Sequence, residues 1–215
     1  MKADSNPEPQ VGAPRDRILR AAEHLFAVKG LHGAGLREIA READVNVNLI
    51  TYYFRTKEEL YLQVYQVRSL QINGLREKLL EQLDLKYSPA SPPVAEILRA
   101  FVHPFFDLKA KSPDVWTNVV HSYMREIGTD VWRTINESSL QPAVRRFTTV
   151  LHRSLPSAQR SDIVFILGMA AYSSLIGAAP SDPALIDDGL PRNLPLAEIE
   201  DKLVLALTAA AHALS

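Results

Sequence analysis

The sequence of 215 residues contains no cysteine. This absence excludes a disulfide-stabilised scaffold and any metal site built from thiolates. It suits the reducing environment of the cytoplasm, where we expect the protein to reside. The six histidines are scattered without the spacing of metal ligands, and neither a glycine-rich phosphate loop nor a nucleophile motif is present. The sequence therefore predicts no cofactor, no metal site and no enzymatic activity.

An excess of charge and a long apolar run are also missing. The formal net charge is −1, so the composition as a whole gives no sign of a nucleic-acid partner. The uncharged stretch Ile163–Ala179 is shorter than the roughly 20 residues needed to span a bilayer, and no basic cluster flanks it. We therefore expect no membrane association and interpret this stretch as a helix buried on all sides in a protein interface.

Apolar residues recur at helical spacing along nearly the whole chain, and no useful stretch alternates with the period of a strand. Residues 1–14 are the exception, because they are polar and proline-rich, and we interpret them as a flexible tail rather than a signal peptide. The fold class predicted is all-α. The predicted helices are Arg15–Gly30, Leu36–Ala43, Val47–Phe54, Thr56 to about Leu85, Val94–Ala110, Pro113–Ile127, Asp130–Leu155, Asp162–Ala179 and Leu196–Leu214.

Local signals fix several helix ends. Gly30 is typical of a C-terminal stop, and Thr56 with Glu59 has the spacing of a capping box. Ser112 precedes a proline and is predicted to cap the helix that begins there. Pro142 is expected to break or kink the helical segment around it, because proline lacks the backbone N–H and its ring clashes with the preceding turn.

The connection between the second and third helices is the most informative part of the sequence. Ala43-Asp44-Val45 forms a short turn whose central residue tolerates a left-handed backbone. Ile50 and Phe54 are expected to lie in the core, which turns short polar and aromatic side chains outward. Such groups suit base edges and thymine methyl groups in the major groove. The outward-facing residues are predicted to be Asn46, Asn48, Leu49, Thr51 and Tyr52.

From about Arg15 to Leu60 the sequence resembles the TetR family of bacterial transcription regulators. The matching features are the pair Leu25-Phe26, Gly30, the pair Ile39-Ala40, Val45, and Tyr53-Phe54 followed by Lys57, Glu58 and Leu60. The resemblance implies a base-facing recognition helix and phosphate contacts from Tyr53 and Lys57. The recognition-helix positions that match are Val47, Asn48, Leu49, Thr51 and Tyr52, and we add Arg37 at the start of the second helix.

Three positions depart from the family pattern. Gly35 stands where a serine or threonine commonly caps the second helix, and Asp44 replaces a usual turn glycine. Thr51 occupies a position where tyrosine is frequent, which puts that one contact in doubt. Tyr52 has a second interpretation as a packing residue.

A possible effector site lies in the C-terminal part of the chain. His121 and Arg125 are four residues apart and therefore share a helix face. Together with nearby large apolar side chains they could line a pocket for a small molecule. The alternative is that the apolar residues are plain core and His121 a buried histidine with satisfied hydrogen bonds. The predicted lining residues are Phe105, Trp116, His121, Tyr123, Met124 and Arg125.

The last two helices carry small and apolar residues on all sides, which is more apolar surface than one monomer needs to cover. Pairing with their symmetry mates would give a four-helix interface, and the TetR resemblance also implies that these helices dimerise. The predicted interface residues are Ile166, Ala170, Ser174, Gly177, Leu203, Leu207 and Ala210.

These observations together predict a homodimeric repressor that binds a pseudo-palindromic operator in double-stranded DNA and is released by an unknown small-molecule effector. The expected domains are a helix-turn-helix domain at residues 15–60 and an effector-binding and dimerisation domain at residues 61–215. The long helix that begins at Lys57 is the expected link between them. The alternatives are a helical adaptor with a vestigial helix-turn-helix and an enzyme on a helical scaffold.

Overall fold

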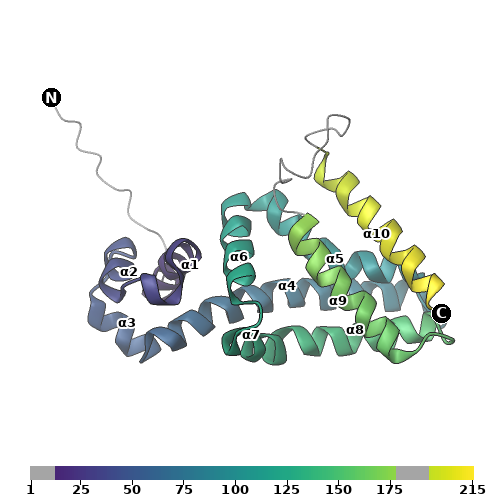
Figure 1. The fold of residues 1–215 in the computed structure, drawn as a ribbon, viewed down its shortest axis with the longest axis horizontal. Helices are drawn as coiled ribbons and strands as arrows, with labels where there is room; N and C mark the ends of the chain where they lie inside the picture. Colours follow the sequence, from purple (N-terminus) through teal and green to yellow (C-terminus); the bar gives the residue numbers. More distant parts are fainter. Residues whose placement is uncertain (1–12, 178–193) are drawn as a thin grey trace. The chain divides into compact units, whose positions relative to one another are not determined.

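The computed structural model describes residues 13–177 and 194–215 (Figure 1). Helices make up almost all of these residues, and no strand occurs among them, which confirms the all-α prediction. The chain divides into two compact units between Tyr65 and Gln66. The elements are α1 (Pro14–Gly33), α2 (Leu36–Glu42), α3 (Val47–Phe54), α4 (Lys57–Tyr87), α5 (Val94–Lys111), α6 (Pro113–Glu126), α7 (Asp130–Ile135), η1 (Asn136–Leu140), α8 (Gln141–Ser154), α9 (Arg160–Gly177) and α10 (Leu196–Ala213).

The first unit contains α1, α2, α3 and the start of α4. Its core is a set of apolar side chains that the helical spacing brings to one side of each helix, and Phe26 meets Tyr61 edge to face at 4.8 Å between ring centroids. Gly30 has φ 71° and interrupts α1 before a last turn, which confirms it as the point where the helix breaks. The buried core residues include Ile18, Ala22, Phe26, Ile39, Ile50, Phe54, Leu60 and Tyr61.

Helix α4 begins where the sequence predicted. The backbone N–H of Glu59 donates to Oγ1 of Thr56 at 3.0 Å, which confirms Thr56 as the cap. The helix continues through Gly74 to Tyr87 without interruption. It is the one described element that contributes residues to both units.

The second unit is built around α5, which packs against α6, α8, α9 and α10. Phe101 on α5 and Phe147 on α8 are fully buried and meet edge to face at 5.0 Å. Ser112 precedes α6, but its side chain makes no capping hydrogen bond, so that prediction was wrong. Its backbone has φ −147° and ψ 72°, outside the extended conformation that the other side-chain caps adopt.

Pro142 breaks the regular helix as predicted. The segment after Asp130 divides into α7, the single π-helical turn η1 and then α8, with Pro142 in the first turn of α8. The wider turn accommodates a residue that cannot donate a backbone hydrogen bond to the preceding turn. This irregular segment contributes Asn136 of η1 to the lining of a cavity.

In the described ranges, no helix is long and apolar enough to cross a membrane. Helix α9, which is uncharged from Ile163 to its end, is buried on one face only. Ile166, Leu167 and Ala170 lie in the core of the second unit, whereas Phe165 and Met169 are exposed.

Candidate DNA-binding and effector-binding sites

Helices α2 and α3 are joined by the tight turn that the sequence predicted. Asp44 adopts φ 51°, the left-handed conformation that Asp and Asn tolerate better than most residues. Arg17 of α1 fixes this turn, since its guanidinium donates to the carbonyl oxygens of Ala43 at 3.0 Å and Asp44 at 3.1 Å. Arg17 had no role in the sequence interpretation, because an exposed arginine on a first helix gives no local signal.

Asn46, predicted to face DNA bases, serves first as the cap of α3. Its Oδ1 accepts a hydrogen bond from the backbone N–H of Asn48 at 2.9 Å. This bond explains why α3 begins at Val47 and holds the first turn of the helix in place.

Helix α3 presents one buried and one exposed face. Ile50 and Phe54 are each 1% exposed and lie in the core, as predicted. Asn48 and Thr51 are exposed, and Tyr52 is 78% exposed, so Tyr52 is not a packing residue of this chain. The exposed face therefore carries amide, hydroxyl and phenol groups that can reach base edges. The flanking residues Val47 and Leu49 are half-buried.

Three side chains on or next to α3 are suited to hold the DNA backbone. Tyr53 is 37% exposed and lies next to Tyr52, with ring centroids 5.4 Å apart. Lys57 is half-buried at the start of α4, and its ammonium donates to the carbonyl oxygen of Ala34 at 3.2 Å. Arg37 is exposed in the first turn of α2. An ammonium has two further N–H donors, so Lys57 can bind a phosphate while it tethers the α2 entry.

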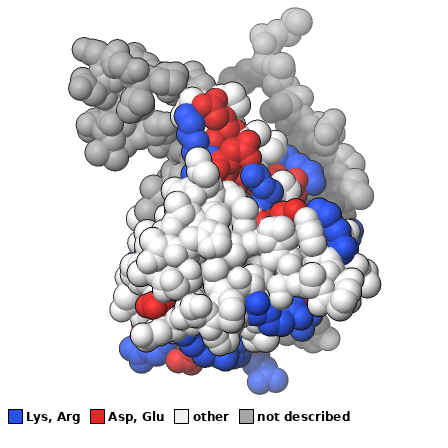
Figure 2. Space-filling model, turned by 90° about the vertical axis from the view of Figure 1, so that its right-hand side faces the viewer, with Lys and Arg blue, Asp and Glu red and all other residues white. Residues whose placement is uncertain are grey.

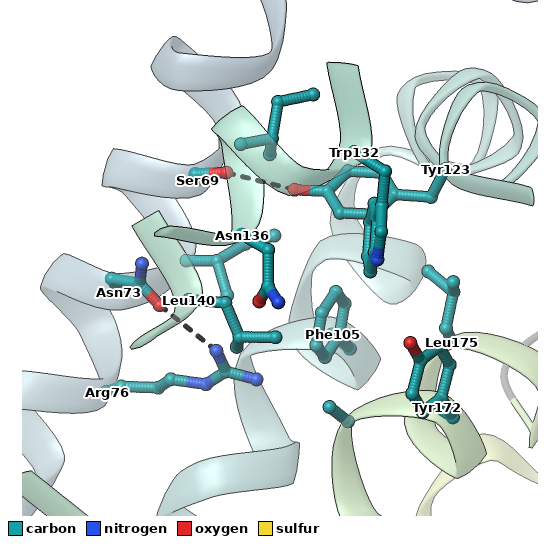
Figure 3. A pocket seen from close by; sticks show the side chains of 13 residues that line it. Ser69, Asn73, Arg76, Phe105, Tyr123, Trp132, Asn136, Leu140, Tyr172 and Leu175 are labelled. Atoms are coloured by element: carbon teal, nitrogen blue, oxygen red, sulfur yellow. Dashed lines mark hydrogen bonds between the residues drawn. The ribbon is translucent and has the colours of Figure 1, made fainter. Parts of the chain in front are cut away.

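The second unit contains an apolar cavity between α4, α5, α6, α7, η1 and α9 (Figure 3). It has about 540 Å³ of space free of atoms, with its mouth included. The polar residues in its wall are few, as in typical small-molecule sites. The lining residues are Ser69, Ile72, Asn73, Arg76, Phe105, Tyr123, Trp132, Ile135, Asn136, Leu140, Ala171, Tyr172 and Leu175.

Of the six pocket residues predicted from the sequence, only Phe105 and Tyr123 line this cavity. Trp116 is buried against Phe105, with ring centroids 5.6 Å apart, and so belongs to the core. His121 and Arg125 share a face of α6 as expected, but that face is exposed, and Met124 is 49% exposed.

The lining residues that the sequence interpretation missed lie mainly on α4. Ser69, Asn73 and Arg76 have the spacing i, i+4, i+7 and therefore share one helix face with the buried Ile72 and Leu80. Polar side chains at core positions of a long amphipathic helix are the signal that could have found the cavity.

Burial of the Tyr123 ring raises the pKa of its hydroxyl, because the charged form would lose its hydration. The hydroxyl groups of Tyr123 and Ser69 form a hydrogen bond of 2.9 Å at one end of the cavity. Both groups are therefore neutral at physiological pH, and this end of the cavity offers neutral hydrogen-bonding groups only.

Four of the predicted dimer-interface residues are buried within the single chain, which corrects that part of the prediction. Ile166, Ala170, Ser174 and Leu207 are each at most 2% exposed, because α9 and α10 turn these faces toward α5. Leu203 and Ala210 are partly buried against the same core. The burial of Gly177, the last residue of α9, is outside the described part of the structure.

Large apolar side chains instead stand on the outer faces of α9 and α10. Figure 2 shows the molecule from the side where α10 lies in Figure 1, and charged residues are sparse over the middle of that face. Apolar side chains exposed on an outer surface are candidates for an interaction site. The exposed residues are Val164, Phe165, Met169 and Tyr172 on α9 and Leu205 on α10.

Comparison with known proteins gives curated relatives of 33–45% sequence identity over part of the chain. This chain is 37% identical over 95 residues to the transcriptional activator FasR of Mycolicibacterium smegmatis, and the match covers 43% of this chain and 39% of FasR. It is 33% identical over 108 residues to the transcriptional repressor NicS of Pseudomonas putida, covering 50% of this chain and 47% of NicS. The chain thus spans less than half the length of each of these two relatives.

Solved structures with the same fold cover nearly the whole chain. The regulator FadR from Bacillus subtilis, in complex with stearoyl-CoA, superposes with a TM-score of 0.66 at 17% identity, covering 91% of this chain and 98% of FadR. A transcriptional regulator from Aquifex aeolicus superposes with a TM-score of 0.63 at 22% identity, covering 92% of this chain and 99% of that one.

Family profiles match both units of the chain. Residues 18–64 match the bacterial regulatory proteins of the tetR family, and residues 99–213 match the tetracyclin repressor-like C-terminal domain. The first match contains the whole helix-turn-helix, and the second covers more than half of the chain. The chain therefore belongs to the TetR family and is a transcription regulator with a DNA-binding helix-turn-helix rather than an enzyme.

Proposed function

We propose that the protein is a cytoplasmic homodimeric repressor that binds a pseudo-palindromic operator through α3. The observation that carries this proposal is the exposed polar face of α3 on a well-packed helix-turn-helix. Asn48, Thr51 and Tyr52 would read base edges, with Val47 and Leu49 at the margins of the contact, while Tyr53, Lys57 and Arg37 would hold phosphates. Selection of bound sequences from a random duplex library tests it, because a dimer should select two inverted half-sites.

We propose further that a small molecule in the second unit controls operator binding. Helix α4 supports this, because it carries Lys57 at its start and lines the cavity with Ser69, Asn73 and Arg76. A ligand that binds one conformation of α4 more tightly than another shifts the equilibrium between them, by at most the ratio of its two affinities, and so changes the operator affinity.

The dimer interface is proposed on the exposed apolar faces of α9 and α10. A twofold axis would bring Phe165, Met169 and Leu205 of one copy against the same surface of the other. This replaces the inner faces that the sequence suggested, since those are used by the chain's own core.

Replacing Lys57 by alanine is expected to weaken binding to all DNA sequences. The loss of one phosphate contact should lower the slope of log K against log salt concentration by about one. Fluorescence anisotropy with the selected duplex at several salt concentrations measures that slope. Lys78→Ala, an exposed lysine on the part of α4 in the second unit, is the control and should leave the slope unchanged. An unaltered slope in the Lys57 variant would remove Lys57 from the phosphate contacts.

Gly35→Ser is expected to raise operator affinity. Gly35 is the cap position of α2, where the backbone is extended and an added Cβ would meet nothing within 4 Å. A serine hydroxyl there can accept from a free N–H of α2, worth a few tenths of a kcal/mol over glycine, and can also donate to a phosphate. Anisotropy titrations check the affinity, with Gly74→Ser on α4 as the matched control. Reduced affinity in the Gly35 variant would mean that DNA approaches too closely for a side chain.

A further inference from the structure

The cavity of the second unit contains a fully buried guanidinium, that of Arg76 on α4. Arg76 is 2% exposed, its Nε donates to the carbonyl oxygen of Phe101 at 2.8 Å, and its Nη1 donates to Oδ1 of Asn73 at 3.0 Å. Its Nη2 is buried without any hydrogen-bond partner and, among the described residues, is the only such side-chain atom. Figure 3 shows the guanidinium pointing into the space between Leu140 and Phe105.

No carboxylate among the described residues neutralises the charge of this guanidinium. Burial lowers the pKa of Arg76 to about 9, and no carboxylate among the described residues contributes an opposing effect. With that pKa the group remains protonated at pH 7, so the cavity contains a positive charge. A buried cation without an anionic partner is costly, and an anion that enters the cavity would remove that cost.

The cavity wall around the guanidinium is mainly aromatic. Phe105, Tyr123, Trp132 and Tyr172 surround the space, and Trp132 meets Tyr123 at 5.5 Å and Tyr172 at 6.4 Å between ring centroids. Aromatic side chains favour a flat apolar ligand that stacks on them or meets them edge to face. The amide of Asn136 also lines the cavity and offers a further polar group to a ligand.

We propose that the effector of this protein is a small aromatic carboxylate, with its carboxylate on Arg76 Nη2 and its ring among Phe105, Trp132 and Tyr172. A carboxylate matches the planar fork of an arginine, and one unpaired Nη2 suits its two oxygens better than the three of a phosphate. This inference rests on the proposed effector control of operator binding and names the chemical class of the effector.

Isothermal titration calorimetry on the full chain tests the ligand class with matched pairs of probes. Benzoate, phenylacetate and cinnamate are compared with benzamide, phenylacetamide and cinnamamide, which keep the ring and lose the charge. At least one carboxylate is expected to bind tenfold or more tightly than its amide. Equal affinities within each pair, no binding of any carboxylate, or tighter binding of phenyl phosphate than of benzoate would overturn the proposal.

Variants identify the site. Arg76→Met should weaken binding of the preferred carboxylate tenfold or more, whereas Lys78→Met on the exposed side of α4 should leave it unchanged. Arg76→Gln, which keeps hydrogen-bond donors without the charge, is the second variant should the first not fold. Unchanged carboxylate affinity in a folded Arg76 variant would show that the anion binds elsewhere.

Measuring operator release by the same ligands distinguishes a failure of the carboxylate proposal from a failure of the proposed effector control. If a carboxylate binds in an Arg76-dependent way but leaves operator affinity unchanged, the ligand class stands and the proposed control of DNA binding fails. If the amides release the operator and the carboxylates do not, effector control stands and the carboxylate proposal fails.

Discussion

Phe165→Glu is expected to convert the protein from a dimer to a monomer and to abolish operator binding with it. Phe165 is 60% exposed on α9, within the apolar surface that includes Met169 on α9 and Leu205 on α10. In a twofold interface the substitution buries two carboxylates on opposing apolar surfaces, at a cost of several kcal/mol. Sedimentation velocity at micromolar concentration measures the oligomeric state, and anisotropy with the selected duplex measures DNA binding.

Two control variants distinguish loss of the dimer from the effect of an added surface charge and from unfolding. Leu85→Glu changes an even more exposed leucine at the end of α4, at 83%, and should remain dimeric. Leu207→Glu places a carboxylate in the core of the second unit, where Leu207 is 2% exposed, and should lower the melting temperature rather than only dissociate the dimer. A dimeric, folded Phe165→Glu protein would place the interface on another surface.

The sequence predicted the helix-turn-helix because its local chemistry and its packing agree. The spacing of Ile50 and Phe54, the cap at Asn46 and the left-handed turn at Asp44 each favour the same backbone. The bounds of α3 could therefore be predicted residue by residue. The break at Pro142 was also predictable, but the π-helical form of the turn before it was not, since proline only forbids the regular hydrogen bond.

The interface prediction failed because α9 is apolar on nearly all sides. A helix without a polar face gives no periodic signal that separates the side facing its own core from a side facing a partner. Ser174 illustrates this ambiguity, because its hydroxyl donates to the carbonyl oxygen of Ala170 and can therefore be fully buried in the chain's own core. Only the tertiary packing of α5 against α9 decides which face remains exposed.

Most residues of the cavity in the second unit were missed for a related reason. His121 and Arg125 on α6 do share a face, but Trp116 and Val119 on another face of the same helix are apolar and take the buried side. Arg76 escaped notice because arginine is almost never fully buried without a partner, so its position on α4 suggested a solvated charge. Its burial follows from the packing of α4 against aromatic rings. The guanidinium carbon lies 3.9 Å from the ring centroid of Phe101 and 5.1 Å from that of Phe105.

Arg76→Met is expected to raise the free energy of unfolding of the ligand-free protein by about 1–4 kcal/mol at pH 7, because an apolar side chain of similar length removes a buried charge. The gain should depend on pH. The pKa of Arg76 is about 9 in the folded state, well below the ordinary value that an arginine has in the unfolded state. Below pH 9 both states are protonated, so the folded wild type carries the full cost of burial.

Above pH 9 the folded wild type releases this proton before the unfolded chain does, so its stability rises relative to the variant and the advantage of methionine shrinks. Urea denaturation at pH 7 and pH 10, with equal protein concentrations, measures this difference. Tyr123, the titratable group beside Arg76, is present in both proteins. Lys78→Met, which removes an exposed charge from the same helix, should change stability by at most about 0.5 kcal/mol at either pH. A wild type more stable than Arg76→Met at pH 7 would mean that the hydrogen bonds to Phe101 and Asn73 outweigh the cost of the buried charge, and the cavity would then have no energetic need for an anion.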